Sequence, residues 1–105
     1  MVPIDYYPDR QNSEDELLWL LHSARESDLN LLRIWGGGLY LPSQFYQLAD
    51  ELGVLIWQDA MFSCKFYPYL DEAFIENARA ELREQVSRLQ HHPSIIMWVL
   101  NNEGE

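Results

Sequence analysis

Short apolar runs without polar alternation set the strongest limit on the fold. Residues Ile95 to Leu100 are apolar without interruption, as are residues Val54 to Trp57. Leu31 to Trp35 has a similar β character, although it includes Arg33. Continuous apolar runs of this length are typical of strands that are buried on both faces, as in a parallel sheet. Each run therefore predicts a strand, and Met1 to Ile4 suggests a further strand at the start of the chain.

Helical patterns separate these runs. The first begins with a capping box from Ser13 to Glu16 and places Trp19 in a helix, where we expect it in the core. The second runs from Pro42 to Gly53, a residue type that favours the left-handed end of a helix. The third begins at an Asp71 cap and stops before Pro93. Because parallel strands are joined by helical crossovers, this alternation predicts an α/β fold with parallel strands.

The composition argues against several classes of function. The 105 residues suffice for one small domain. Seven basic residues against 17 acidic ones give a net charge of −10, which argues against nucleic acid as a partner. No apolar run approaches the roughly 20 residues that a membrane span needs. The single Cys64 cannot form an internal disulfide, and the N-terminal residues lack the pattern of a secretion signal.

The ends of the predicted strands carry the residues best suited to a binding site. Ligands bind at the carboxyl ends of parallel strands, so these residues are expected on one rim. They are carboxylates, amides, an arginine and tryptophans, which suit the hydroxyl groups and ring faces of sugars. The set comprises Asp5, Arg33, Trp35, Trp57, Gln58, Asp59, Trp98, Asn101, Asn102 and Glu103.

Glu103 is the candidate for acid catalysis. It follows the last apolar run with no turn in between, so we expect it at a rigid strand end. A general acid needs a partly desolvated carboxyl group at the lip of a pocket. Asn102, immediately before it, can hydrogen-bond a substrate hydroxyl. The alternative is a carboxylate that only caps or solvates a loop.

Other conspicuous features have more ordinary explanations. Gly36 to Gly38 lacks the spacing of a phosphate-binding loop. His91 and His92 are adjacent and do not face each other on a helix, so a structural role at the helix C-terminus is favoured over a metal pair. Cys64, beside Lys65, has no histidine placed to activate it as a nucleophile. We therefore expect no metal and no cofactor.

Blocks of the sequence, taken together, resemble the β-mannosidases. They are Arg33 to Tyr40, Phe45 to Asp59 and His92 to Glu103. β-Mannosidases are exo-acting retaining enzymes of the large glycoside hydrolase family that also contains β-galactosidases and β-glucuronidases. The resemblance extends over nearly the whole chain, and the order of the blocks makes it specific.

This resemblance implies a (β/α)₈ TIM barrel, of which residues 1–105 would form the first half, with about four parallel strands and three helices. It implies a fragment of a retaining exo-β-mannosidase that releases terminal β-D-mannose from oligosaccharides or glycans. A eukaryotic parent enzyme would be lysosomal. Glu103 would be the general acid/base, and the implied substrate-binding residues are Asn102, Trp35, Arg33 and Asp59.

The chain also departs from the family pattern. Family members usually follow the Asn-Glu pair with another Asn-Glu, whereas Gly104 and Glu105 stand here. The nucleophilic glutamate of the family lies later in the barrel than this chain extends, so we expect the isolated chain to be inactive. Two alternatives stay open. One is a non-catalytic half barrel that binds a carbohydrate or a protein, and the other is a fragment of a sister enzyme such as an exo-β-glucosaminidase.

Overall fold

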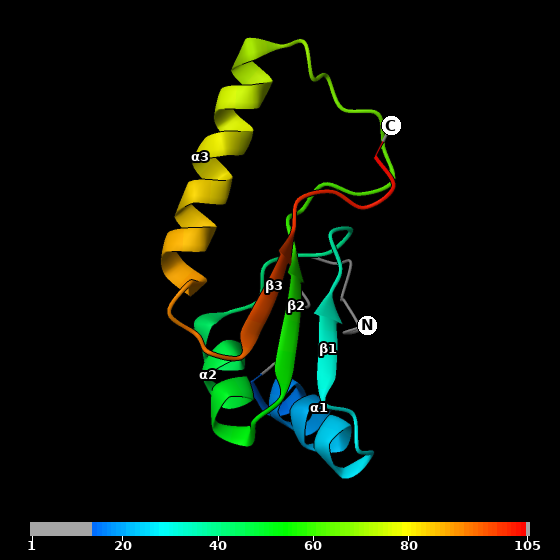
Figure 1. Cartoon of the computed structure of the whole chain (residues 1–105), viewed down its shortest axis with the longest axis vertical. Helices are drawn as coiled ribbons and strands as arrows, with labels where there is room; N and C mark the ends of the chain where they lie inside the picture. Colours follow the sequence, from blue (N-terminus) through cyan, green and yellow to red (C-terminus); the bar gives the residue numbers. More distant parts are fainter. Residues whose placement is uncertain (1–13, 105) are drawn as a thin grey trace.

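The structure is a computed structural model that describes residues 14–104. In this part of the chain, helices and strands alternate as the sequence predicts (Figure 1). The strand predicted at residues 1–4, the rim residue Asp5 and the capping residue Ser13 lie outside the described residues. The elements in chain order are α1 (Glu14–Glu26), β1 (Leu31–Ile34), α2 (Ser43–Leu52), β2 (Leu55–Asp59), α3 (Glu72–Leu89) and β3 (Ile95–Val99).

The strands form one parallel sheet in the order β1-β2-β3. Leu31 lies opposite Leu55 in the first pair, and Trp57 lies opposite Met97 in the second. This confirms the predicted parallel α/β arrangement, with three strands in the described residues. Because all strands point the same way, the segments that follow them gather at one end of the sheet, as Figure 1 shows.

Helices α1 and α2 share a core with β1 and β2. The buried side chains repeat at helical spacing on α1 and α2 and alternate along the strands. They include Leu17, Leu21, Ala24, Leu32, Ile34, Phe45, Tyr46, Ala49, Val54 and Ile56. The prediction that Trp19 joins this core was wrong, because its side chain is 71% exposed. It lies two residues from Leu17 and from Leu21, and residues two apart point to different faces of a helix.

Both predicted helix signals at Gly53 and Asp71 are confirmed. Gly53 has a φ of 70°, the left-handed conformation in which glycine ends a helix without a Cβ clash. The Asp71 side chain accepts hydrogen bonds from the backbone N–H groups of Ala73 and Phe74, which have no partner within the first turn of α3. No helix in residues 14–104 is long and apolar enough to cross a membrane.

Strand β3 is more exposed than its sequence predicts. An uninterrupted apolar run indicates burial on both faces, but Ile96 is 55% exposed and Leu100 61%. β3 has β2 on one side only, and its other side carries no strand in the described residues. On α3, Leu89 is the buried member of the apolar stripe, while Ile75, Ala78, Leu82 and Val86 are half-buried.

Candidate active site

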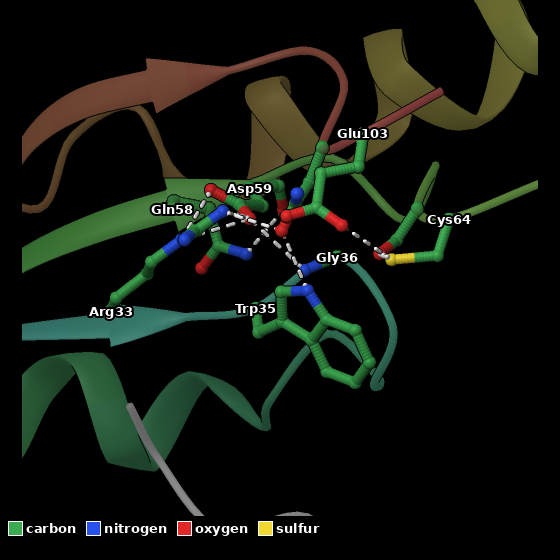
Figure 2. Close-up of polar contacts among 9 residues, drawn as sticks. Arg33, Trp35, Gly36, Gln58, Asp59, Cys64 and Glu103 are labelled. Carbon is green, nitrogen blue, oxygen red and sulfur yellow. Dashed lines mark hydrogen bonds and ion pairs between the residues drawn. The ribbon is translucent and has the colours of Figure 1, made fainter. Parts of the chain in front are cut away.

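The site residues predicted from the sequence lie at the carboxyl end of the sheet. Arg33 belongs to β1, Trp35 follows that strand, and Asp59 ends β2. Asn102 and Glu103 follow β3. The structure brings Arg33, Trp35, Asp59 and Asn102 into one hydrogen-bonded group, which we call the rim cluster. Figure 2 shows the side chains of this region turned toward one another.

Asp59 and Arg33 form the centre of the rim cluster. The Arg33 guanidinium donates to Asp59 Oδ2 from Nη2 at 2.6 Å and from Nε at 3.1 Å. The backbone N–H of Gly36 donates to the same oxygen at 3.1 Å. Asp59 is fully buried, and a buried carboxylate is costly unless it is paired and hydrogen-bonded. Arg33 also lies over the ring of Trp57, 4.8 Å from its centroid, in a cation–π arrangement.

Two glycines allow the chain to pass close to this cluster. A Cβ on Gly36 would lie 2.5 Å from the carbonyl oxygen of Ala60, so a larger residue would push β1 away from β2. A Cβ on Gly37 would lie 2.1 Å from the ring of Trp35. The glycine run thus permits the Gly36 bond to Asp59 and gives the Trp35 ring room to fold back over the chain.

Asn102 is held by two donors at its amide oxygen. Arg33 Nη2 donates to Asn102 Oδ1 at 2.8 Å, and Trp35 Nε1 donates to it at 2.7 Å. Because both partners are donors, the oxygen must occupy this position rather than the amide nitrogen. The two N–H donors of the Asn102 side chain are therefore on the side away from Arg33 and Trp35.

Backbone hydrogen bonds join the segment after β3 to the segment after β2. Ser63 and Asn102 form an isolated parallel bridge. The N–H of Cys64 donates to the carbonyl of Asn102 at 2.8 Å, and the N–H of Asn102 donates to the carbonyl of Phe62 at 3.0 Å. These bonds fix the backbone of Asn102 independently of its side chain.

Glu103 lies in a bend rather than at the end of a strand. Strand β3 ends at Val99, and Glu103 has a φ of 51°, in the left-handed region. Its side chain is exposed, and its Oε2 lies 3.7 Å from the thiol of Cys64. The expectation of a rigid strand end therefore needs correction, because the neighbouring loop holds this segment.

Gln58, which the sequence predicts on the rim, is fully buried beside the rim cluster and bonds Tyr46, a residue that the sequence did not mark. The buried Tyr46 hydroxyl donates to Gln58 Oε1, and Gln58 Nε2 donates to the backbone carbonyl of Asp59 at 2.8 Å. Burial raises the pKa of Tyr46 well above its usual value, so it stays a neutral donor.

A second ionisable group lies at the amino end of the sheet. His92 Nδ1 is 2.6 Å from Asp50 Oδ2, and the N–H of Ser94 donates to Asp50 Oδ1 at 2.9 Å. Burial acts to raise the pKa of Asp50, but the hydrogen bonds from Ser94 and His92 outweigh it and lower the pKa. The structural role favoured for the His91–His92 pair is filled by His92.

Comparison with known proteins identifies the relatives of this chain. No protein-family model matches it. It is 51% identical over 104 residues to the β-mannosidase of Capra hircus, which covers 99% of this chain and 12% of that protein. The solved β-D-mannosidase of Dictyoglomus thermophilum has a TM-score of 0.79 and 45% identity, covering 82% of this chain and 10% of that one.

A more distant structure shows the same fold alone. The β-glucuronidase of Parabacteroides merdae has a TM-score of 0.76 at 24% identity, covering 87% of this chain and 11% of its own. The chain thus spans a small part of each relative. Its resemblance to the β-mannosidases is confirmed over nearly its whole length, and the chain is homologous to one segment of these glycoside hydrolases.

Proposed function

We propose that the chain is a segment of a retaining exo-β-mannosidase and supplies the acid/base half of its active site. The observation that carries this proposal is the rim cluster, which fixes the amide of Asn102 directly before the exposed carboxyl group of Glu103. The names of the relatives support a β-mannoside as the substrate. The sequential parallel order β1-β2-β3 supports a place in a (β/α)₈ barrel, and the resemblance to the family suggests its first half.

Glu103 is the proton donor in this proposal. In a retaining glycosidase, one carboxyl group protonates the departing glycosidic oxygen and later deprotonates the incoming water. A second carboxylate about 5–5.5 Å away attacks the anomeric carbon. Asp59 is unsuited to that attack, because it is buried and bonded to Arg33 and Gly36. The nucleophile would come from another part of a longer protein, and the chain by itself would be inactive.

The rim cluster would orient the sugar through Asn102 and Trp35. The N–H donors of Asn102, turned away from Arg33, would bind a sugar hydroxyl, and Trp35 would line the pocket. Asp59 is 0% exposed, so we propose that it acts by positioning Arg33 rather than by touching the substrate. This assigns a more indirect role to Asp59 than the resemblance implied.

The test is Glu103→Gln in the full-length protein that contains this segment. Glutamine keeps the shape of the side chain but cannot donate and retrieve a proton, so kcat/KM on a poorly activated β-mannoside should fall roughly 10²- to 10⁴-fold. For an aryl β-mannoside with an acidic leaving group, kcat/KM should fall much less, because that leaving group departs with little protonation. Glu84→Gln, on the exposed face of α3, is the matched control.

Near-normal hydrolysis of the poorly activated substrate by the Glu103→Gln protein would remove Glu103 from this role. Faster turnover of a β-glucosaminide than of a β-mannoside by the unmodified protein would favour the sister activity instead.

A further inference from the structure

We propose that the Cys64 thiol is a positioning residue that sets which oxygen of Glu103 carries the proton. This inference rests on the proposed acid/base role of Glu103. Cys64 Sγ lies 3.7 Å from Glu103 Oε2, within reach of an S–H donor to a carboxyl oxygen. Figure 2 shows the sulfur and the carboxyl group facing each other across the two loops.

The backbone holds both residues in this arrangement. Cys64 has a φ of 52° and Glu103 a φ of 51°, values that non-glycine residues rarely adopt. Such conformations persist where the surrounding structure determines them. Here the Cys64 N–H donates to the carbonyl of Asn102, so the two left-handed bends are tied together directly beside the side-chain contact. The approach of the two side chains thus follows from the backbone of both loops.

The thiol is itself oriented from the buried side. Ser63 Oγ donates to Cys64 Sγ at 3.2 Å, which leaves the S–H proton free to point toward Glu103. Ser63 is buried, and its backbone is fixed by Tyr67, whose hydroxyl bonds both its N–H, at 2.7 Å, and its carbonyl, at 3.2 Å. The contact between Cys64 and Glu103 is therefore supported by the buried side chain of Ser63.

A donor at Oε2 has a defined consequence for the acid form of Glu103. In a protonated carboxyl group, one oxygen carries the proton and donates, while the other remains an acceptor. A thiol that donates to Oε2 stabilises the form in which Oε2 is the acceptor and Oε1 carries the proton. Oε1 is then the oxygen that delivers the proton to the glycosidic oxygen. Without the thiol, the proton would be distributed over both oxygens, and the carboxyl group would also be free to rotate away from the glycosidic oxygen.

The experiment measures kcat/KM for Cys64→Ala in the full-length protein, with one poorly activated β-mannoside and one highly activated aryl β-mannoside. We expect a loss of roughly 3- to 10-fold on the poorly activated substrate, in line with one neutral hydrogen bond. On the activated substrate we expect no change beyond about twofold, because that leaving group needs little protonation. Cys64→Ser should recover part of the loss. Lys65→Ala, in the same exposed loop, should behave like the unmodified protein on both substrates.

Equal losses on both substrates would overturn the proposal, because they would indicate a general structural effect, and so would no loss on either. If thermal unfolding shows that Cys64→Ala is destabilised, Cys64→Gly takes its place under the same expectations, since glycine suits a φ of 52°. Glu103→Gln is measured alongside. If Glu103→Gln leaves kcat/KM on the poorly activated substrate unchanged, the proposed function fails. If Glu103→Gln lowers that kcat/KM but the Cys64 variants affect both substrates alike, only the positioning role of Cys64 fails.

Discussion

The two ends of the sheet each hold a carboxylate that is bonded to a basic side chain, but the two pairs serve different neighbours. At the carboxyl end, Asp59 pairs with Arg33. Arg33 also donates a hydrogen bond to Asn102, which directly precedes the exposed Glu103. At the amino end, Asp50 pairs with His92 and with the backbone N–H of Ser94, directly before β3.

We interpret the carboxyl-end network as part of the proposed active site and the amino-end network as structural. The carboxyl-end network finishes on side chains whose donors and acceptors can bind a ligand. Parallel α/β folds bind their ligands at this end of the sheet. The amino-end network finishes on the backbone N–H of Ser94, so it joins α2 to the start of β3. Mutations at the two ends should therefore separate activity from stability.

Among the variants that separate the two ends of the sheet, the largest effect is expected for Asp59→Ala in the full-length protein. Arg33 would lose its partner and the N–H of Gly36 its acceptor, so Asn102 would no longer be held in place. We expect kcat/KM to fall by about 10²-fold. The free energy of unfolding should fall by about 2–4 kcal/mol, somewhat less than for a fully buried pair, because Arg33 is partly exposed.

The measurements are steady-state kinetics and thermal unfolding of the same preparation. Unchanged kcat/KM in a folded Asp59→Ala protein would show that the rim cluster does not position the site.

Asp50→Ala should have the opposite profile. Removing Asp50 leaves His92 and the Ser94 N–H without their acceptor, so we expect a stability loss of about 1–3 kcal/mol. The kcat/KM of the folded protein should not change, because Asp50 is at the far end of the strands from Glu103. A fall in kcat/KM as large as that of Asp59→Ala would mean that the two ends are not independent.

Trp35→Phe should have a small effect confined to activity. Phenylalanine keeps an aromatic ring but removes the N–H that donates to Asn102, while the Arg33 donor remains. We expect kcat/KM to fall roughly 3- to 10-fold, as for the loss of one hydrogen bond. Trp19→Phe, at an exposed position on α1, is the matched control and should change nothing. Equal kinetics for Trp35→Phe and Trp19→Phe would remove the Trp35 N–H from the network.

The smallest effect is a pH dependence of stability at the amino end. The folded-state pKa of Asp50 lies below its ordinary value of 3.8, so its contribution is complete above that value and is lost as pH falls through the folded pKa. The difference in thermal unfolding midpoint between the unmodified protein and Asp50→Asn should therefore shrink as the pH falls below about 3.8. A difference that grows on acidification would contradict the assigned direction.

Local patterns were sufficient to predict most of the fold. Each of these patterns depends only on residues close to it in the sequence. The strands at the apolar runs, the helix cap at Asp71 and the helix end at Gly53 all appear in the structure as expected. Trp19 is exposed because it lies on a different face of α1 from the buried Leu17 and Leu21. The exposure of β3 agrees with the resemblance to a partial barrel, because β3 has β2 as its only neighbouring strand in the described residues.

The site was predictable as a set of residues but not as a network. The positions of these residues at strand ends predicted that they share one rim, and the structure brings four of them together: Arg33, Trp35, Asp59 and Asn102. The burial of Asp59 depends on the close approach of β1 and β2, which sequence spacing does not reveal. The contact of Cys64 with Glu103 joins two loops 39 residues apart, so no local pattern marks it.

The central claim is that Glu103 acts as the acid/base of a retaining reaction, and azide rescue of Glu103→Ala in the full-length protein tests it most directly. With an activated aryl β-mannoside, the glycosyl-enzyme should form but be hydrolysed slowly, because no base assists the water. Azide needs no base, so the account predicts faster turnover as azide is added and a mannosyl azide product that retains the β configuration. No acceleration by azide, or an α-configured product, would contradict the account.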